Sequence, residues 1–201
     1  MEAAMRRAEK REHLIDIALQ LFNRHGYHAT GIDRIMAETG IAKTTLYRHF
    51  ESKEDLIVAV LAKADEMARE EMRAFVERAS DDPRERLLAT FGQLDVWLRD
   101  CEFKGCPFVA AAGEYGDAKS PVFQQVRLHK RLYFAYFEEL VRAARIADPK
   151  RVAAQIVMLH EGAIAYAQVL GRDGAADMAR HGFGGFGPGA RDFRDGLVDQ
   201  R

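Results

Sequence analysis

The sequence predicts an all-α protein, because helical periodicity and helix end signals recur along almost the whole chain and no strand pattern competes with them. Apolar residues return at intervals of three and four, which places them on one face of a helix. Cap residues, proline at first helical positions and glycine after helix ends separate the segments. With 48% hydrophobic and 30% charged residues, the 201-residue chain has enough apolar surface for a packed core.

Three helices are predicted in the N-terminal quarter of the chain. The first runs from about Arg7 to His25, and Gly26 after it can take the left-handed conformation that ends a helix. The second follows Thr30, whose hydroxyl can cap it. The third follows Gly40 and runs from about Ala42 to Phe50. A helix, a tight turn and a second helix between residues 30 and 50 are typical of a helix–turn–helix.

A long connector helix is predicted next, beginning after Ser52 and continuing to about Ala79. Asp55 follows Ser52 by three residues, which is a capping-box arrangement. A shorter helix is predicted over residues 108–115. Three further helices are expected where an N-cap residue precedes proline, at Asp82-Pro83, Ser120-Pro121 and Asp148-Pro149.

These elements divide the chain into three expected regions. Residues 1–52 form a helix–turn–helix domain, residues 53–181 a second helical domain, and residues 182–201 a glycine-rich end that is expected to be mobile. The last helix is expected to end near Arg180, because glycines follow at 182, 184 and 185.

Composition narrows the function classes. The formal net charge is −1, yet residues 1–53 hold 9 Lys or Arg against 7 Asp or Glu, so the basic part is N-terminal, where it supports a nucleic-acid partner.

No run approaches the roughly 20 apolar residues of a membrane helix, and the charged start does not resemble a secretion signal. No membrane partner and a cytoplasmic location are therefore expected. Two cysteines without zinc-type spacing predict no metal, and no other cofactor is expected.

The run from Thr30 to Phe50 carries the functional signal. Its specific elements are Thr30 before the second helix, Gly40 in the turn, the ending Leu-Tyr-Arg-His-Phe at residues 46–50, and Lys53 beyond it. Together these residues resemble the TetR family. The resemblance implies a homodimeric transcriptional repressor that binds a pseudo-palindromic double-stranded operator. It also implies that a small-molecule effector, bound within residues 53–181, releases the protein from DNA.

The third helix is the expected DNA reader, since a helix fits the major groove and its exposed face reaches base edges. The side chains expected to read bases are Lys43, Thr44, Thr45 and Arg48. Those expected to contact phosphates are Thr30, Tyr47, His49 and Lys53. Leu46 and Phe50 are expected in the core. For Tyr47 and Lys53 the alternative is a solvated surface pair.

Two interpretations stay open for a set of aromatic and apolar residues in the second domain. They either line an effector pocket or pack as an ordinary core, because aromatic residues at helical spacing serve both purposes. The residues concerned are Phe91, Leu94, Trp97, Phe108, Val126, His129, Tyr133, Phe137 and His160.

The predicted helix from Pro149 to about Leu170 is apolar on two sides, so it needs two partners. One partner is expected to be a second copy of the chain, because a two-fold symmetric operator requires two readers about 34 Å apart. The stripe predicted for this contact holds Val152, Ile156, Leu159, Ala163 and Ala167. The alternative is a helix buried inside a monomer.

Two other functions would use different residues. Cys101 and Cys106 allow a thiol-based redox or electrophile sensor that acts through the same reader, with simple packing of the thiols as the alternative. An enzyme would need a His/Glu site in which His129, His160, Glu161 and Glu114 converge. Their spacings match no zinc or catalytic signature, so no enzymatic activity is expected.

Overall fold

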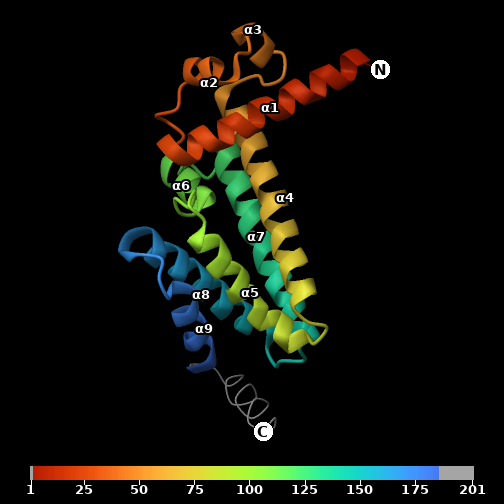
Figure 1. Cartoon of the computed structure of the whole chain (residues 1–201), viewed down its shortest axis with the longest axis vertical. Helices are drawn as coiled ribbons and strands as arrows, with labels where there is room; N and C mark the ends of the chain where they lie inside the picture. Colours follow the sequence, from red (N-terminus) through yellow and green to blue (C-terminus); the bar gives the residue numbers. More distant parts are fainter. Residues whose placement is uncertain (1, 186–201) are drawn as a thin grey trace. The chain divides into compact units, whose positions relative to one another are not determined.

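The computed structural model describes residues 2–185, with side chains placed from residue 7 to residue 184. Within this range the chain is helical and contains no strand, which confirms the predicted all-α class (Figure 1). The helices are α1 (Glu2–His25), α2 (Ile32–Thr39), α3 (Lys43–Leu46), α4 (Lys53–Ala79), α5 (Pro83–Arg99), α6 (Pro107–Glu114), α7 (Pro121–Ala143), α8 (Pro149–Leu170) and α9 (Ala175–Gly185).

The helices form two compact units. Unit 1 comprises Met1–Ala68 and Cys106–His129, and unit 2 comprises Arg69–Gly105 and Lys130–Arg201. Helices α1, α2, α3 and α6 lie wholly in unit 1, and α5, α8 and α9 in unit 2, whereas α4 and α7 contribute to both. The boundary predicted at residue 52 falls inside unit 1, because the first part of α4 packs with the helix–turn–helix.

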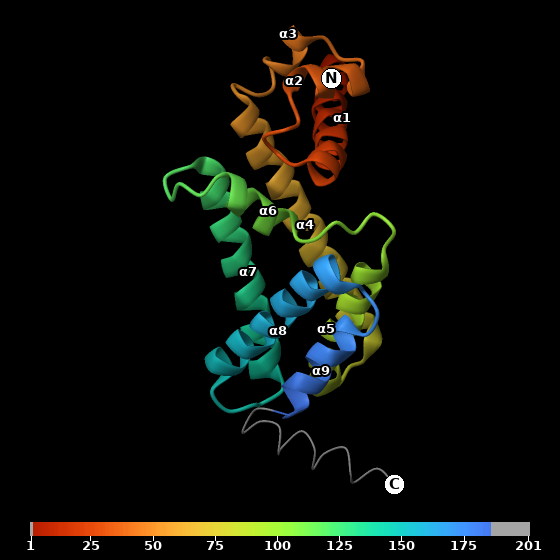
Figure 2. The same ribbon diagram turned by 90° about the vertical axis from the view of Figure 1, so that its left-hand side faces the viewer.

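Helices α1, α2 and α3 lie close together in unit 1 (Figure 2). The apolar side chains in this part of the chain form a small buried core. Gly26 (φ +83°) and Gly40 (φ +66°) both take the left-handed conformation that ends the preceding helix. Leu46 and Phe50 are buried, as predicted. Other buried members of this core are Leu14, Ala18, Leu21, Phe22, Ile35, Leu56, Ile57 and Val60.

Helix α3 is shorter than predicted and ends at Leu46. Beyond it the backbone continues as tight turns, in which the Arg48 N–H donates to the Thr45 carbonyl and the Phe50 N–H to the Leu46 carbonyl. Such mixed bonding tightens the last turn of a helix. It lets Leu46 and Phe50 both reach the core.

The predicted role of Thr30 as a helix cap is wrong. Helix α2 begins at Ile32 with Gly31 as its N-cap, and no side chain caps it. Thr30 is fully buried, and its hydroxyl donates to the backbone carbonyls of Gly26 (2.7 Å) and Leu21 (3.3 Å). Because the last carbonyls of a helix have no partner within it, the end of α1 captures this hydroxyl.

The later helix starts agree with the sequence pattern more closely. Ser52 Oγ accepts from the Asp55 N–H at 3.1 Å, as a capping box requires. Asp82 caps α5 by accepting from the Arg84 and Glu85 N–H groups. Helix α8 begins at Pro149 as predicted, but Asp148 makes no capping bond and instead pairs with Arg151.

Helix α9 contradicts the predicted end near Arg180, since it continues to Gly185. Two contacts within unit 2 hold its last turns. The Phe183 ring stacks on Phe91 with centroids 6.0 Å apart, and Gly182 packs so close to Leu159 that a Cβ there would lie 3.2 Å from Leu159 Cδ2. The glycines therefore permit close helix packing instead of ending the helix. The rest of the predicted mobile end, residues 186–201, lies outside the described residues.

Helix α8 packs against α5 and α9 in unit 2 (Figures 1 and 2). The stripe predicted for a homodimer contact is on this covered side. Val152, Ile156, Ala163 and Ala167 are at most 6% exposed, and Leu159 is half-buried beneath Gly182. Because their own chain already covers these side chains, they form the core of the subunit. None of the described helices is both long and apolar enough to cross a membrane.

Candidate nucleic-acid interface

The turn at Gly40 and the short helix α3 present polar side chains to solvent. Lys43, Thr44, Tyr47 and Arg48 are exposed, and Thr45 and His49 are half-buried. Tyr47 keeps 48% of its surface accessible although it is a large aromatic residue. An exposed tyrosine beside arginine and lysine provides hydrogen-bond donors suited to a phosphate backbone. These positions are compatible with the predicted contacts, which stay predictions.

Lys43 is paired in the free protein. Its Nζ lies 2.9 Å from Asp33 Oδ1, and both side chains are more than half exposed. The hydrogen bond and the charge of Asp33 raise the pKa of Lys43. The lysine is therefore fully charged at neutral pH. The predicted DNA contact of Lys43 would require this lysine to leave the Asp33 carboxylate.

Basic residues of α1 extend the positive surface beside α3. The Arg7 guanidinium donates to the Arg48 carbonyl at 3.4 Å. Burial, followed by the charges of Arg7, Arg11 and Lys10, lowers the pKa of His49, so its ring is neutral at neutral pH. The sequence interpretation missed these three α1 residues, although their dense basic run was visible.

Two residues predicted to contact phosphates, Thr30 and Lys53, donate hydrogen bonds to backbone carbonyls of the protein itself. Thr30 has no accessible surface, and its two acceptors are the backbone carbonyls of Leu21 in α1 and of Gly26 just after it, so its assignment to phosphate is corrected to a structural role. Lys53, the first residue of α4, is half-buried and donates to the His28 carbonyl at 3.3 Å. Burial lowers the pKa of Lys53.

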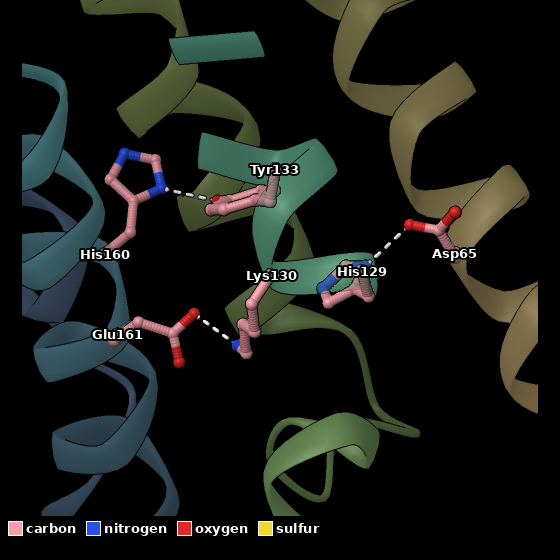
Figure 3. A network of polar contacts seen from close by, with 6 residues as sticks. All are labelled: Asp65, His129, Lys130, Tyr133, His160 and Glu161. Atoms are coloured by element: carbon pink, nitrogen blue, oxygen red, sulfur yellow. Dashed lines mark hydrogen bonds and ion pairs between the residues drawn. The ribbon is translucent and has the colours of Figure 1, made fainter. Parts of the chain in front are cut away.

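Three of the predicted pocket residues, Tyr133, Phe91 and Phe137, contact a fourth, His160, in unit 2. Its Nδ1 lies 3.0 Å from the Tyr133 hydroxyl (Figure 3), and its Nε2 lies 3.4 Å from Thr90 Oγ1. The rings of Phe91 and Phe137 contact it with centroids 4.6 and 5.0 Å away. Burial lowers the pKa of His160 to about 3, so the ring is neutral at physiological pH. Leu94 and Trp97 also belong to unit 2.

The remaining pocket candidates, Phe108, Val126 and His129, belong to unit 1 and are buried. His129 Nδ1 lies 2.7 Å from Asp65 Oδ1 (Figure 3), and the His129 ring stacks on Phe108 with centroids 3.5 Å apart. This cluster joins α4, α6 and α7 within unit 1. A buried acid–histidine pair of this kind satisfies both polar groups without solvent.

The residues of the hypothetical enzyme site each have a separate structural partner. Glu161 pairs with Lys130 at 2.5 Å (Figure 3), His129 with Asp65, and His160 with Tyr133. Glu114 accepts hydrogen bonds from backbone N–H groups. Among residues 7–184, no three His, Cys, Asp or Glu side chains gather in a way that would hold a metal ion.

Comparison with known proteins connects both parts of the chain to one family. Residues 14–60 match the family model "Bacterial regulatory proteins, tetR family", and residues 83–183 match "Tetracyclin repressor-like, C-terminal domain". The HTH-type transcriptional regulator LmrA from Bacillus subtilis is 27% identical over 152 residues, which cover 75% of this chain and 80% of LmrA.

Solved structures agree over nearly the whole length. A TetR-family transcriptional regulator from Streptomyces coelicolor superposes with a TM-score of 0.83 at 32% identity, covering 89% of this chain and 94% of that one. A TetR transcriptional regulator from Chloroflexus aurantiacus gives 0.78 at 29% identity, with coverages of 89% and 94%. These relatives are transcriptional regulators, a class that is typically not enzymatic. The chain belongs to the TetR family of DNA-binding transcriptional regulators.

Proposed function

We propose that this regulator is a repressor that binds a pseudo-palindromic operator as a homodimer and leaves it when a small molecule binds unit 2. The observation that carries the proposal is the exposed polar face of α3, anchored from behind by the buried Leu46 and Phe50. A short helix held in this way can enter the major groove without losing its core contacts. Regulators of this family bind DNA and act as dimers, which supports the two-fold arrangement.

The base readers in this proposal are Lys43, Thr44, Thr45 and Arg48, and the phosphate contacts are Tyr47, His49 and Lys53. Binding-site selection from a random duplex library tests it. Enrichment of a palindrome supports the proposal, and Arg48→Ala is then expected to relax base preference at one position of each half-site. Tyr47→Ala is expected to weaken all sites about equally. Failure of the wild-type protein to enrich any sequence would contradict the proposed function.

We place the homodimer contact on the exposed face of α8, opposite the buried stripe. Residues 158, 162, 165, 166 and 169 follow helical spacing, and all are exposed. Met158, Tyr166 and Val169 are 65%, 41% and 79% exposed, which is unusual for large apolar side chains on one helix. The small Gly162 and Ala165 between them allow close approach of a second helix. Burial of this face in a symmetric copy accounts for its apolar character.

The dimer proposal is tested by Val169→Glu. A charge in an apolar interface is costly, so the variant is expected to shift from dimer to monomer in analytical ultracentrifugation. Val96→Glu is the matched control, since Val96 is a 60% exposed valine on a different helix, α5. If Val169→Glu sediments as the wild type does, the contact lies elsewhere.

For the effector we propose the neighbourhood of His160, where Tyr133 is half-buried and the surrounding rings are apolar. The chemistry fits a compact apolar molecule with one hydrogen-bonding group that replaces the Tyr133 hydroxyl at the neutral imidazole. The protein itself needs no cofactor or catalytic activity for this role. Because the matching family model describes bacterial regulatory proteins, and bacterial DNA lies in the cytoplasm, we propose that this protein acts there.

The thiol-sensor alternative rests on one observation, the exposure of Cys101, whereas Cys106 is buried. Oxidant and apolar compounds are added separately to a wild-type operator complex and to a Cys101→Ser complex. Release by compounds alone favours the effector site. Release by oxidant that Cys101→Ser abolishes favours the sensor.

A further inference from the structure

The α1–α2 turn of unit 1 is held by a side chain from outside the helix–turn–helix. Glu114, the last residue of α6, accepts from the Tyr27 N–H at 2.8 Å through Oε1 and from the His28 N–H at 2.5 Å through Oε2. One carboxylate thus binds two successive backbone donors. Bonds of this charge-assisted type are stronger than neutral ones.

The rest of α6 contacts the same turn. The Tyr27 hydroxyl donates to the Pro107 carbonyl at 3.1 Å, at the start of α6. The His28 Nε2 lies 2.9 Å from the Glu114 carbonyl oxygen, and the His28 ring stacks on Tyr115 with centroids 4.6 Å apart. Both ends of α6 therefore form hydrogen bonds with the consecutive residues Tyr27 and His28.

Close packing at Gly26 indicates how tightly the carboxylate fits. A Cβ at this position would lie 3.0 Å from Glu114 Oε1, and its φ of +83° is one that side chains rarely adopt. The turn leads directly into α2 through the buried Thr30, and Lys53 bonds the His28 carbonyl from the start of α4. Residues 26–28 are thus bonded both to α6 and to the start of α4, immediately before α2.

We infer that Glu114 is a positioning residue for DNA reading: its carboxylate fixes the α1–α2 turn and so sets the orientation of α2 and α3. The functional DNA-reading unit then includes α6 as well as the segment 14–60 that matches the DNA-binding family model. This inference rests on the proposed operator binding. It adds that the placement of the reader depends on a residue of α6, which lies outside the helix–turn–helix.

Glu114→Gln is the sharpest test, because it keeps the shape of the side chain and removes its charge. The amide can accept from one of the two N–H groups but turns its own NH₂ toward the other. Operator binding is expected to weaken by roughly tenfold, as for the loss of one charge-assisted hydrogen bond. Glu66→Gln is the matched control, since Glu66 is an exposed carboxylate of α4 in the same unit.

A positioning role predicts more than weaker binding. Fluorescence anisotropy is measured on operators selected by the wild type, with the half-site spacing lengthened or shortened in single base-pair steps. The wild type and Glu66→Gln are expected to prefer one spacing, whereas Glu114→Gln is expected to bind neighbouring spacings more evenly. A purely structural loss would lower affinity at every spacing equally.

Tyr27→Phe provides a milder second variant that removes only the bond to Pro107, and it is expected to broaden the spacing preference in the same direction. Amide hydrogen exchange at Tyr27 and His28 is expected to speed up in Glu114→Gln. If both variants keep the wild-type spacing preference, the inference is overturned while operator binding stands. If the wild type binds no selected DNA, the proposed function fails and the inference falls with it.

Discussion

Replacing Asp33 with asparagine is expected to strengthen operator binding. In the free protein the Asp33 carboxylate holds the Lys43 ammonium at 2.9 Å, at the first residue of α3. DNA has to compete with this carboxylate for the lysine, and the phosphates also repel it. The asparagine variant retains the size of the side chain and removes both obstacles.

The magnitude follows from the exposure of the pair. Because both side chains are more than half exposed, water and salt screen their attraction, and pairs of this kind correspond to roughly a two- to fivefold change in an equilibrium constant. Removing the Asp33 carboxylate also makes the DNA-facing surface more positive by one charge. The slope of log K against log salt concentration is therefore expected to steepen by at most roughly 0.9.

The assay is operator binding over a series of salt concentrations for the wild type, Asp33→Asn and Glu70→Gln. Glu70 is an exposed carboxylate of unit 2 and controls for the change in net charge alone. In a Lys43→Ala background the effect of Asp33→Asn is expected to shrink. An equal gain with Glu70→Gln, or a gain that persists without Lys43, would refute the competition.

Two further predictions concern unit 2. The folded-state pKa of His160, about 3, lies below its usual 6.5, so unfolding takes up a proton below pH 6.5. Stability from this group is complete above pH 6.5 and falls as the pH decreases toward 3. Between pH 6.5 and 4.5 the wild type is expected to lose about 2–3 kcal/mol more than His160→Asn in urea unfolding, and equal losses would contradict a buried neutral imidazole. Gly105→Ala is expected to destabilise by about 1–3 kcal/mol, because the φ of Gly105, +104°, is one that L side chains rarely adopt, and because a Cβ there would also displace the end of the Gln168 side chain. The control Gly113→Ala, with open space around it in α6, is expected to be neutral or stabilising, and a similar cost at both glycines would rule out this explanation.

Local signals predicted the helices well, because proline and cap residues act on their immediate neighbours. Pro83, Pro121 and Pro149 each begin a helix as expected. Errors arose where a distant contact decided the outcome. Thr30 has the chemistry of a cap, yet the carbonyls of α1 bind its hydroxyl. The glycines after Arg180 oppose a helix locally, but packing of Gly182 on Leu159 extends it.

The candidate site was predictable to the same limited degree. Periodicity identified two apolar sides of α8 without showing which side its own subunit covers, because both sides contain residues of similar hydrophobicity. The positions of Lys43 and Arg48 on α3 followed from the motif. The ion pair between Lys43 and Asp33 and the hydrogen bond from Tyr27 to Glu114 could not be predicted from the motif. Each joins residues whose proximity depends on the tertiary fold.

The division of unit 1 along the chain has a consequence for its synthesis. Residues 106–129 complete this unit, but the segment 69–105 of unit 2 is made before them. During translation, helices α1 to α3 therefore leave the ribosome long before Glu114 can bind Tyr27. A nascent chain interrupted before residue 114 carries every predicted DNA contact and lacks the carboxylate that fixes the turn. If Glu114 positions the reader as we infer, such an unfinished chain is expected to bind the operator less selectively than the complete protein does.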